Sequence, residues 1–433
     1  MTAPRPAVVV VGAGIVGTAT AWELARRGIA TTLLDRGEVS GGTTGLGEGN
    51  VLASDKDTGP ELDLTVLGLA VYDEIEALLG PVARIRRKGA LIVHPDARTW
   101  AAEPARAERL RAAGVEARLI DAEEVRRREP RLTGELHGAL HVPRDLQCDP
   151  RAIARALAGE ARRLGATVRT GAEVARVVVE GDEARGGGAT RGGGATRSGG
   201  ATRSGAEARG GGASGRVTRG DEPGAGGRVV GVELTSGEVI AAPTVVLAAG
   251  PWTRPLAESA GVPLPLEPRK GQLLRLRLPA PDPRWLRHKI VDGSYLLSVT
   301  SAATARQVST VIETTHDGHV IVGSTRERSG FDPSVDAALE DVVRERAARL
   351  VPDVAGLVRD SAWVGFRPWL PDHLPAIGPS ERVAGLHLAT GHEGAGVALG
   401  PVTGRVIAGA IAGEPPPMDL TPFAPDRFGA SGP

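Results

Sequence analysis

The 433-residue sequence contains a single cysteine, Cys148, so it can form no internal disulfide and no cluster of cysteine ligands around a metal. It also lacks a charge surplus, because 52 Lys and Arg balance 52 Asp and Glu. Proteins that bind nucleic acid usually carry a basic surplus. We therefore expect no metal site and no nucleic-acid partner, and we expect Cys148 to be a partly buried, small apolar residue.

Long apolar runs are missing as well. No stretch reaches the roughly 18 consecutive apolar residues of a membrane-spanning helix. The N-terminal sequence MTAPRPAVVVVGAG has a short apolar run that leads straight into glycines, without the cleavage site of a signal peptide. We expect a cytoplasmic protein without a membrane span, and the length predicts roughly two to three domains.

The first 35 residues have the pattern of a β-strand, a helix and a second β-strand. Ala7–Val11 and Ala30–Leu34 are short apolar runs typical of buried strands, and Ile15–Arg27 between them has a helical pattern that Gly28 ends. Asp35 lies at the end of the second strand, where its carboxylate can accept hydrogen bonds from ribose hydroxyls. This order predicts a βαβ unit that binds a dinucleotide.

The turn between the first strand and the helix has the sequence GxGxxG, at Gly12, Gly14 and Gly17. The first glycine allows the tight turn, the second lets the backbone approach a pyrophosphate, and the third allows close packing of the helix on the strand. The helix N-terminus then offers N–H groups and the positive end of its dipole to the phosphates. The motif alone does not separate NAD from FAD.

Residues 184–227 differ from the rest of the chain, because they are mostly Gly, Ala, Arg, Ser and Thr and contain the triplet Ala-Thr-Arg three times at six-residue intervals. Such a composition cannot fill a core, so we expect a disordered insertion. The flanking segments Val174–Glu180 and Arg228–Thr235 are both typical of strands. The insertion is therefore predicted at the tip of a β-hairpin, where a fold tolerates it.

Further motifs resemble a known family and follow in its expected order. Ala242–Gly250 is similar to the second FAD motif of two-domain flavoproteins, and Pro251-Trp252-Thr253 continues it as in the D-amino-acid oxidase (DAO) family. Other matches are Gly41–Asn50, Lys270-Gly271-Gln272, Trp363–Gly378 and Gly391–Val397. The resemblance covers nearly the whole chain except 184–227. It implies an FAD-dependent oxidoreductase.

The resemblance also implies where the cofactor lies. The AMP and pyrophosphate half is expected on the N-terminal βαβ unit, and the flavin ring against 43–50 and 394–397, facing Arg367. Small residues before and at the start of the last helix, predicted at Val402–Ala412, would expose N–H groups to a reduced flavin. The expected cofactor-binding residues are Gly12, Gly14, Ile15, Val16, Gly17, Asp35, Arg36, Thr43, Thr44, Gly49, Asn50, Val174, Ala249, Gly250, Trp252, Gly394, Ala395, Gly396 and Val397.

Arg367 is the first candidate for substrate contact, because a guanidinium can hold a carboxylate through two parallel hydrogen bonds and the family's matching arginine does so. His392 lies near the flavin in the family and can be purely structural there. Glu48 and Glu393 flank the expected flavin site and could hold a substrate ammonium or be solvated loop residues. Tyr295 is a candidate for a hydroxyl in the substrate pocket.

Two further expectations concern the chemistry of binding. The family's covalent members attach FAD through a cysteine in the segment matching 367–377, which has no cysteine here, so we expect noncovalent FAD. His137 and His141 lie four residues apart, but their segment has a strand pattern, and a metal site there is not expected.

The expected fold is α/β, with a Rossmann-like FAD-binding domain and an interleaved α+β substrate domain built on a mostly antiparallel sheet. The FAD-binding domain is expected to comprise 1–55, 143–183, 228–262 and 362–425, and the substrate domain 56–142 and 263–361. This division requires the chain to pass repeatedly between the two domains.

The expected function is oxidation of a small amino acid or secondary amine by hydride transfer to flavin N5, which gives an imine. Oxygen or another acceptor would then take the electrons. Two alternatives stay open: the flavin subunit of a heteromeric amino-acid, opine or hydroxyproline dehydrogenase, and a non-catalytic flavoprotein. A homo-oligomer is compatible with each of these functions.

Overall fold

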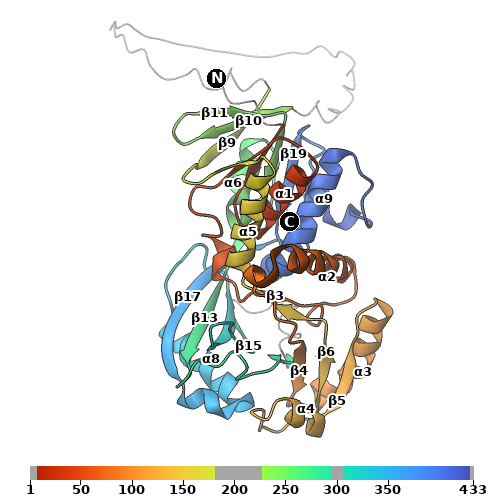
Figure 1. Ribbon diagram of the computed structural model, residues 1–433, viewed down its shortest axis with the longest axis vertical. Coiled ribbons are helices and arrows are strands. Elements are labelled where there is room, and N and C mark those ends of the chain that lie inside the picture. Colours follow the sequence, from red (N-terminus) through yellow and green to blue (C-terminus); the bar gives the residue numbers. More distant parts are fainter. Residues whose placement is uncertain (1–6, 181–226, 295–305, 430–433) are drawn as a thin grey trace, which may run out of the picture.

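The computed structural model describes residues 7–180, 227–294 and 306–429. Its two large sheets lie in two lobes stacked along the long axis of the molecule (Figure 1). The first sheet has the order β18-β19-β12-β1-β2-β8, and its strands are parallel except for β18 at the edge. Its strands are β1 (Val8–Val11), β2 (Thr31–Leu34), β8 (Thr167–Arg169), β12 (Thr244–Leu247), β18 (Ala376–Pro379) and β19 (Leu386–Thr390).

Both faces of this sheet are covered, which is why its central strand is uniformly apolar. Val8 and Val10 of β1 face helices α1 (Ile15–Arg26), α5 (Pro150–Arg163) and α9 (Gly396–Ala412). Val9 and Val11 point to the opposite face, toward helix α6 (Thr253–Ser259) and a small second sheet. The predicted βαβ unit is therefore present, and its first strand, β1, lies in the middle of the sheet.

The small sheet consists of β9 (Val174–Val179), β10 (Val229–Leu234) and β11 (Val239–Ala241). β9 and β10 pair antiparallel from Val174 and Leu234 to Val179 and Val229. The two predicted strands thus form the expected hairpin, with the inserted segment at its tip. Residues 184–226 of that insertion, whose disorder we expected, lie outside the described residues.

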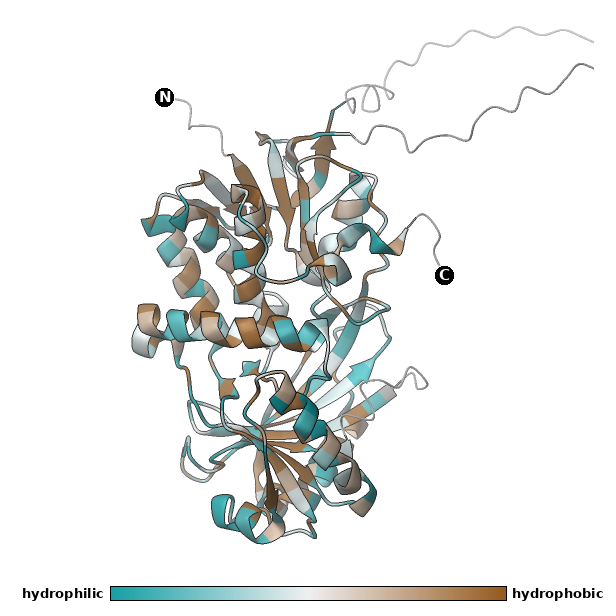
Figure 2. Ribbon diagram, turned by 90° about the vertical axis from the view of Figure 1, so that its right-hand side faces the viewer, coloured by the Kyte–Doolittle hydropathy of each residue, from teal (hydrophilic) through white to brown (hydrophobic). Residues whose placement is uncertain are grey.

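The second large sheet has the order β17-β13-β16-β15-β14-β4-β6-β5 and is antiparallel except between β14 and β4. Helices α3 (Ala97–Ala112), α4 (Ala122–Arg128) and α8 (Ala337–Leu350) belong to this lobe. Figure 2 shows that the hydrophobic colouring follows its strands inside the lobe. Its strands are β4 (Ala90–His94), β5 (Arg118–Asp121), β6 (Gly138–Val142), β13 (Glu267–Arg277), β14 (Lys289–Asp292), β15 (Arg306–Thr314), β16 (His319–Glu327) and β17 (Val358–Trp369).

This architecture confirms the expected α/β fold with a mostly antiparallel second sheet. The chain enters the second sheet twice, through residues 90–142 and 267–369, and the parallel pair β14–β4 joins the two passages. The boundary that we expected at residue 362 falls inside β17, which pairs with β13 over its whole length. Gly365 and Pro368 are disfavoured inside strands, so the sequence pattern does not show this strand.

The last helix, α9, begins at Gly396, six residues before the predicted start at Val402. We placed the start too late because Pro401 lies in the helix, where a proline removes the N–H that would bond the carbonyl four residues earlier. That carbonyl belongs to Val397, and it accepts a hydrogen bond of 2.7 Å from the hydroxyl of Tyr72 on helix α2 (Pro60–Leu79). A buried side chain therefore replaces the missing backbone donor.

One segment of the described chain, Glu393–Ala412, is long and apolar enough to cross a membrane by length and composition alone. In the structure, 67% of its most apolar window is buried inside the molecule. α9 packs on α1 and α2, and its apolar character is accounted for by this packing.

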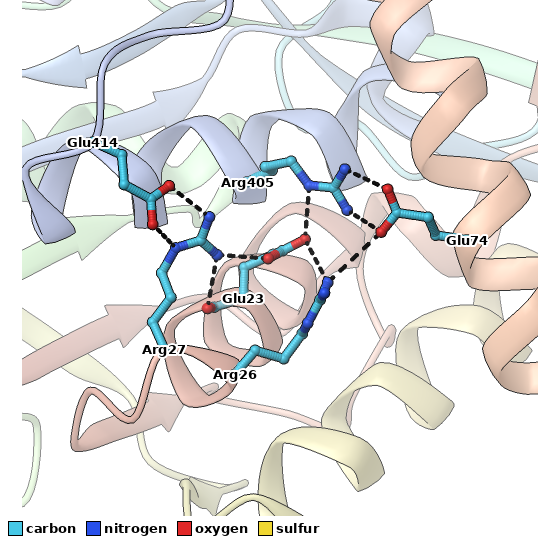
Figure 3. A network of polar contacts seen from close by, with 6 residues as sticks. All are labelled: Glu23, Arg26, Arg27, Glu74, Arg405 and Glu414. Carbon is cyan, nitrogen blue, oxygen red and sulfur yellow. Dashed lines mark hydrogen bonds and ion pairs between the residues drawn. The ribbon is translucent and has the colours of Figure 1, made fainter.

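Charged side chains connect these three helices (Figure 3). The carboxylate of Glu23 on α1 is buried and accepts hydrogen bonds from Arg27 at 2.6 Å and from Arg405 of α9 at 3.0 Å. Arg405 also pairs with Glu74 of α2, and Arg27 pairs with Glu414 beyond α9. The network fixes α1, α2 and α9 relative to one another.

Candidate functional site

A cavity of about 910 Å³ lies between the two lobes. Its walls include the carboxyl ends of β1, β2 and β12 on one side and residues of β13, β16 and β17 on the other. A cleft at the carboxyl ends of parallel strands is the usual ligand position of such sheets. Its size is sufficient for a dinucleotide together with a small substrate.

The glycine turn at one end of the cavity has the packing that the motif predicted. Gly12 has a φ of 106°, and a Cβ there would lie 2.4 Å from the carbonyl oxygen of Ala248. A Cβ on Gly17 would lie 1.8 Å from the carbonyl oxygen of Gly12, so this glycine allows the helix to pack closely. Gly17 does not line the cavity, consistent with that packing role.

Asp35 lines the cavity but also holds the glycine turn. Its Oδ2 accepts a hydrogen bond of 2.6 Å from the N–H of Ala13, and its Oδ1 accepts one of 2.8 Å from Gly37. Thr44 supports the same turn, because its hydroxyl accepts the N–H of Ile15 at 3.0 Å. Both residues are expected to contact the ligand, and their support of the backbone is a further role that the sequence does not show.

The structure brings the expected cofactor residues together from six segments of the chain. Apart from Gly17, all of them line the cavity: Gly12, Gly14, Ile15, Val16, Asp35, Arg36, Thr43, Thr44, Gly49, Asn50, Val174, Ala249, Gly250, Trp252, Gly394, Ala395, Gly396 and Val397. The N-termini of α1 and α9 both face this space, and neither N-cap residue, Gly14 or Ala395, makes a side-chain capping hydrogen bond. Thr44 binds the N–H of Ile15, and the two helix N-termini together suit a ligand with a pyrophosphate and a second electron-rich group.

Two further features fit a flavin dinucleotide. The Oδ1 atom of Asn50 is buried and has no hydrogen-bond partner among the described residues, so it remains available to a ligand donor. At the other end, the guanidinium of Arg36 lies 4.3 Å from the ring centre of Trp252, which stacks on Phe331 at 5.4 Å. Phe331 comes from the loop after β16, so the second lobe packs against Trp252 of this wall.

Arg367 lies on β17 and reaches across Gly271 of the neighbouring strand β13, where a Cβ would come within 2.1 Å of Nη1. Its Nη1 donates to the carbonyl oxygen of Thr325 at 3.0 Å, and its Nη2 donates to Ser324 Oγ at 3.2 Å. Gly394 lies on its other side, with a Cβ position 3.9 Å from Arg367 Nε. The guanidinium is therefore fixed beside the turn that precedes α9.

Glu48 is engaged by the protein itself. Its Oε2 accepts hydrogen bonds from Lys289 Nζ at 2.8 Å and from Asn50 Nδ2 at 2.6 Å. Burial alone would raise the pKa of Glu48, but Lys289 and then Arg367 outweigh it and hold that pKa below its ordinary value. Glu48 is thus a carboxylate that balances two cations in the cavity wall.

Glu393 is held in a similar way at the turn before α9. Its Oε1 accepts a hydrogen bond of 2.7 Å from Arg269, and its Oε2 contacts His373 Nδ1 at 3.1 Å. Burial would raise the pKa of Glu393, but His373, Arg326 and Arg269 together lower it to about 2. The carboxylate is charged at neutral pH and is surrounded by basic groups.

His392 is buried, and its Nε2 lies 3.0 Å from the hydroxyl of Thr403 on α9. Burial lowers the pKa of His392 to about 3, so the ring is neutral at ordinary pH. The contact joins the turn to the helix, which is the structural role that the sequence analysis left open. Tyr295 lies outside the described residues.

The sequence analysis missed three basic residues near the cavity. Lys289 of β14 and Arg326 of β16 line it, and Arg269 of β13 lies behind Glu393. The sequence predicts their strands only in part. A basic residue at every second position of a strand is also typical of a solvent-exposed strand face, so the pattern does not indicate a site. Glu48 and Lys289 lie 241 positions apart in the chain, so no local sequence pattern predicts that they pair.

Known proteins are similar to this chain in sequence and in structure. The family model "DAO: FAD dependent oxidoreductase" matches residues 7–208 and 199–410. The glycine oxidase of Pseudomonas aeruginosa is 35% identical over 201 residues, 46% of this chain and 50% of that protein. The chain thus spans about half the length of that curated relative.

Two other relatives match over longer ranges. The hydrogen cyanide synthase subunit HcnC of Pseudomonas aeruginosa is 28% identical over 313 residues, 72% of this chain and 60% of that protein. The crystal structure of glycine oxidase from Geobacillus kaustophilus superposes with a TM-score of 0.76 at 24% identity, covering 98% of this chain and 99% of that one. Motifs, cavity and family model agree, and the chain belongs to the DAO family of FAD-dependent oxidoreductases.

Proposed function

We propose that the protein oxidises the C–N bond of an amine or amino acid that carries a carboxylate. The observation that carries this proposal is the position of Arg367, a guanidinium fixed in the cavity wall between Ser324 and Gly394. A guanidinium so placed can bind a carboxylate through two hydrogen bonds and orient the adjacent Cα toward the turn before α9. Bound FAD would supply the acceptor for the hydride that leaves this Cα.

The residues around the site have separate roles in this proposal. Arg367 binds and orients the carboxylate, and Glu48 balances the charges of Arg367 and Lys289. The N–H groups at the start of α9 would stabilise negative charge on the cofactor. The names of the relatives, glycine oxidase among them, support a substrate of this class.

The direct test is the substitution Arg367→Ala, measured by anaerobic bleaching of the flavin with a panel of D- and L-amino acids, N-methyl amino acids and cyclic imino acids. The wild-type flavin should be bleached by members of this panel. The variant should retain FAD and lose about 2–4 kcal/mol in kcat/KM, as expected for one lost charge-assisted pair.

Arg328→Ala is the matched control, because Arg328 is exposed and packs over Trp369, outside the cavity lining. It should behave like the wild type. Wild-type kinetics in Arg367→Ala would refute the carboxylate assignment, and a flavin that no amine bleaches would refute the proposed function.

A second candidate is the flavin subunit of a heteromeric dehydrogenase, which the match to a protein named as a subunit favours. The two functions differ in where the electrons go. An oxidase should form peroxide when the purified chain turns over in air, whereas a dehydrogenase subunit should turn over only with an artificial acceptor. We further propose that FAD is bound noncovalently, so denaturation in acid should release all of the flavin from the protein.

A further inference from the structure

Three aromatic rings from the two lobes meet at one wall of the cavity. The ring of Phe331, in the loop after β16, stacks on Trp252 with a centroid distance of 5.4 Å and an angle of 14° between the planes. The same ring makes a T-shaped contact with Phe366 of β17 at 5.3 Å. Trp252 and Phe366 line the cavity, whereas Phe331 lies outside its lining. Phe331 therefore supports the cavity wall from outside.

Trp252 in turn holds a charged side chain of the first lobe. The guanidinium carbon of Arg36 lies 4.3 Å from the ring centre of Trp252, which is within the range of a cation–π contact. Arg36 follows Asp35 at the end of β2 and lines the cavity. Because Arg36 is exposed, its contact with the tryptophan ring restricts the orientation of its guanidinium. A guanidinium held in this way suits the phosphate or other oxygen acceptors of a dinucleotide.

The loop that carries Phe331 is anchored on the second sheet. Lys270 of β13 is 2% exposed, and its Nζ donates a hydrogen bond of 2.8 Å to Asp332 Oδ2, one residue after Phe331. The carboxylate of Asp332 also accepts hydrogen bonds from the N–H of Ser334 at 3.0 Å and from its hydroxyl at 2.7 Å. These contacts fix the loop on β13, so the position of Phe331 is set by the second lobe.

The exposure of Phe331 distinguishes it from a residue of the core. Phe331 is 44% exposed, and the three hydrophobic clusters of buried residues in the described part of the chain do not include it. Its two aromatic contacts are with residues of the cavity wall. The ring therefore acts on the wall of the cofactor site more than on the stability of either lobe.

We propose that Phe331 is a positioning residue for FAD. From the second lobe it holds Trp252, and through Trp252 it holds the guanidinium of Arg36 in the arrangement that binds the cofactor. The second lobe thereby contributes to the retention of FAD through a residue that does not line the cavity. The inference concerns the cofactor alone, so it is independent of the amine or amino acid that the protein oxidises.

The test measures the retention of FAD by the full-length protein and needs no substrate. The FAD-loaded wild type and Phe331→Ala are diluted in series, and the free FAD in the ultrafiltrate gives the dissociation constant. We expect Phe331→Ala to raise this constant about 3- to 10-fold, the contribution of one aromatic pair. Phe331→Tyr keeps the ring and should retain FAD like the wild type. An unchanged dissociation constant in Phe331→Ala would overturn the inference.

Two further variants separate ring stacking from apolar bulk. Val335→Ala is the matched control, because Val335 is also apolar and 39% exposed, follows the same loop and lies outside the cavity lining. It should retain FAD like the wild type. Phe331→Leu keeps an apolar side chain but has no ring to stack, so it should retain FAD as poorly as Phe331→Ala. Wild-type retention in Phe331→Leu would overturn the role of the ring.

A double-mutant cycle tests whether Phe331 acts through Arg36. Arg36→Met removes the guanidinium and keeps an unbranched side chain, so in this background Phe331→Ala has no guanidinium left to release. Its effect on the dissociation constant of FAD should then fall below about twofold. A general loss of stability would instead weaken FAD binding whether or not Arg36 is present. Independent effects of the two substitutions would therefore overturn the positioning role.

Discussion

Individual buried charges determine the geometry near the cavity. Asp145, in the turn after β6, is fully buried and accepts the N–H groups of Ala53 at 2.8 Å and Ser54 at 3.3 Å. These two residues precede Asp55 and Lys56, which line the cavity. Burial raises the pKa of Asp145 to about 7, although the hydrogen bonds from Ser54 and Ala53 oppose this shift.

The raised pKa predicts a pH dependence of stability. Between the ordinary value of 3.8 and about 7, the folded state holds the proton of Asp145 and the unfolded state has lost it. The contribution of this group is therefore full at low pH and declines as the pH rises through this range. The difference in free energy of unfolding between the wild type and Asp145→Asn should fall with rising pH across this window, measured by denaturant titration.

Asparagine keeps an acceptor for Ala53 and does not ionise. The other titrating groups are the same in both proteins, so their effect on the free energy of unfolding cancels in the difference. A difference that stays constant from acidic to neutral pH would show that Asp145 titrates normally in the folded protein.

At the scale of single elements, α9 is the helix on which both the core and the site depend. Its first turn lines the cavity, and its body packs on α1 and α2. Pro401 weakens this helix near its start, and the hydroxyl of Tyr72 compensates by binding the carbonyl of Val397. The sequence shows the proline but not its compensation, because Tyr72 lies on a different helix.

We predict that Tyr72→Phe destabilises the protein by about 1–3 kcal/mol, the cost of an unsatisfied buried acceptor, and weakens FAD binding. The reason is that Val397 and the helix start lie at the cavity. In the Pro401→Ala background the N–H of residue 401 can bond the Val397 carbonyl, so the same Tyr72 substitution should cost less. A double-mutant cycle with thermal unfolding measures this coupling, and additive effects would contradict it.

The charged network that connects α1, α2 and α9 leads to a second prediction at this scale. Glu23 is 1% exposed and faces Arg27 and Arg405, which are 20% and 28% exposed. Glu23→Gln should lower the free energy of unfolding by about 1–3 kcal/mol, less than for a fully buried pair because both arginines retain Glu414 and Glu74.

The matched control is Glu414→Gln. Glu414 pairs with the same Arg27 but is 47% exposed, so its loss should lower the free energy of unfolding less than the loss of Glu23 does. An equal loss in the free energy of unfolding for the two substitutions would show that the burial of Glu23 adds nothing to the stability.

At the scale of the whole molecule, two lobes share one cavity, and the described end of the β9–β10 hairpin that carries the insertion is the end opposite the cavity. β9 and β10 pair up to Val179 and Val229, and the N–H of Glu180 donates to the carbonyl of Arg228 at 2.8 Å. The hairpin is thus complete on both sides of the insertion. Val174 at the opposite end of β9 lines the cavity.

Deletion of residues 184–227 should leave FAD content and kcat/KM within about twofold of the wild type. It leaves residues 181–183 to connect Glu180 to Arg228, a loop length that hairpins commonly use. Shortening the loop should stabilise the fold by up to about 2 kcal/mol through a lower closure entropy. Loss of FAD binding in the deletion variant would show that the tract has a role at the cofactor site.

Much of the cofactor site could be predicted because its signals are local. Gly12, Gly14, Gly17 and Asp35 belong to one βαβ unit, and strand, turn and helix follow from the apolar pattern and the glycines within 35 residues. The family motifs then indicated FAD and Arg367. The structure places all of these except Gly17 around one cavity.

The polar half of the site could not be predicted in the same way. Glu48 and Glu393 were expected as ligands of a substrate ammonium or as solvated residues, and both are instead paired with basic residues of the second sheet. These pairs join positions 241 and 124 residues apart. Their formation depends on the register of β13, β14 and β16.

The sequence by itself thus determined the fold class, the cofactor and an arginine of the cavity wall, Arg367, because each follows from short, contiguous patterns. Only the tertiary structure decided which charges meet in the cavity. An ion pair depends on distance in space, and residues that are distant in the chain become neighbours only when the two lobes fold together. The pairing of Glu48 with Lys289 and of Glu393 with Arg269 belongs to this second kind of information.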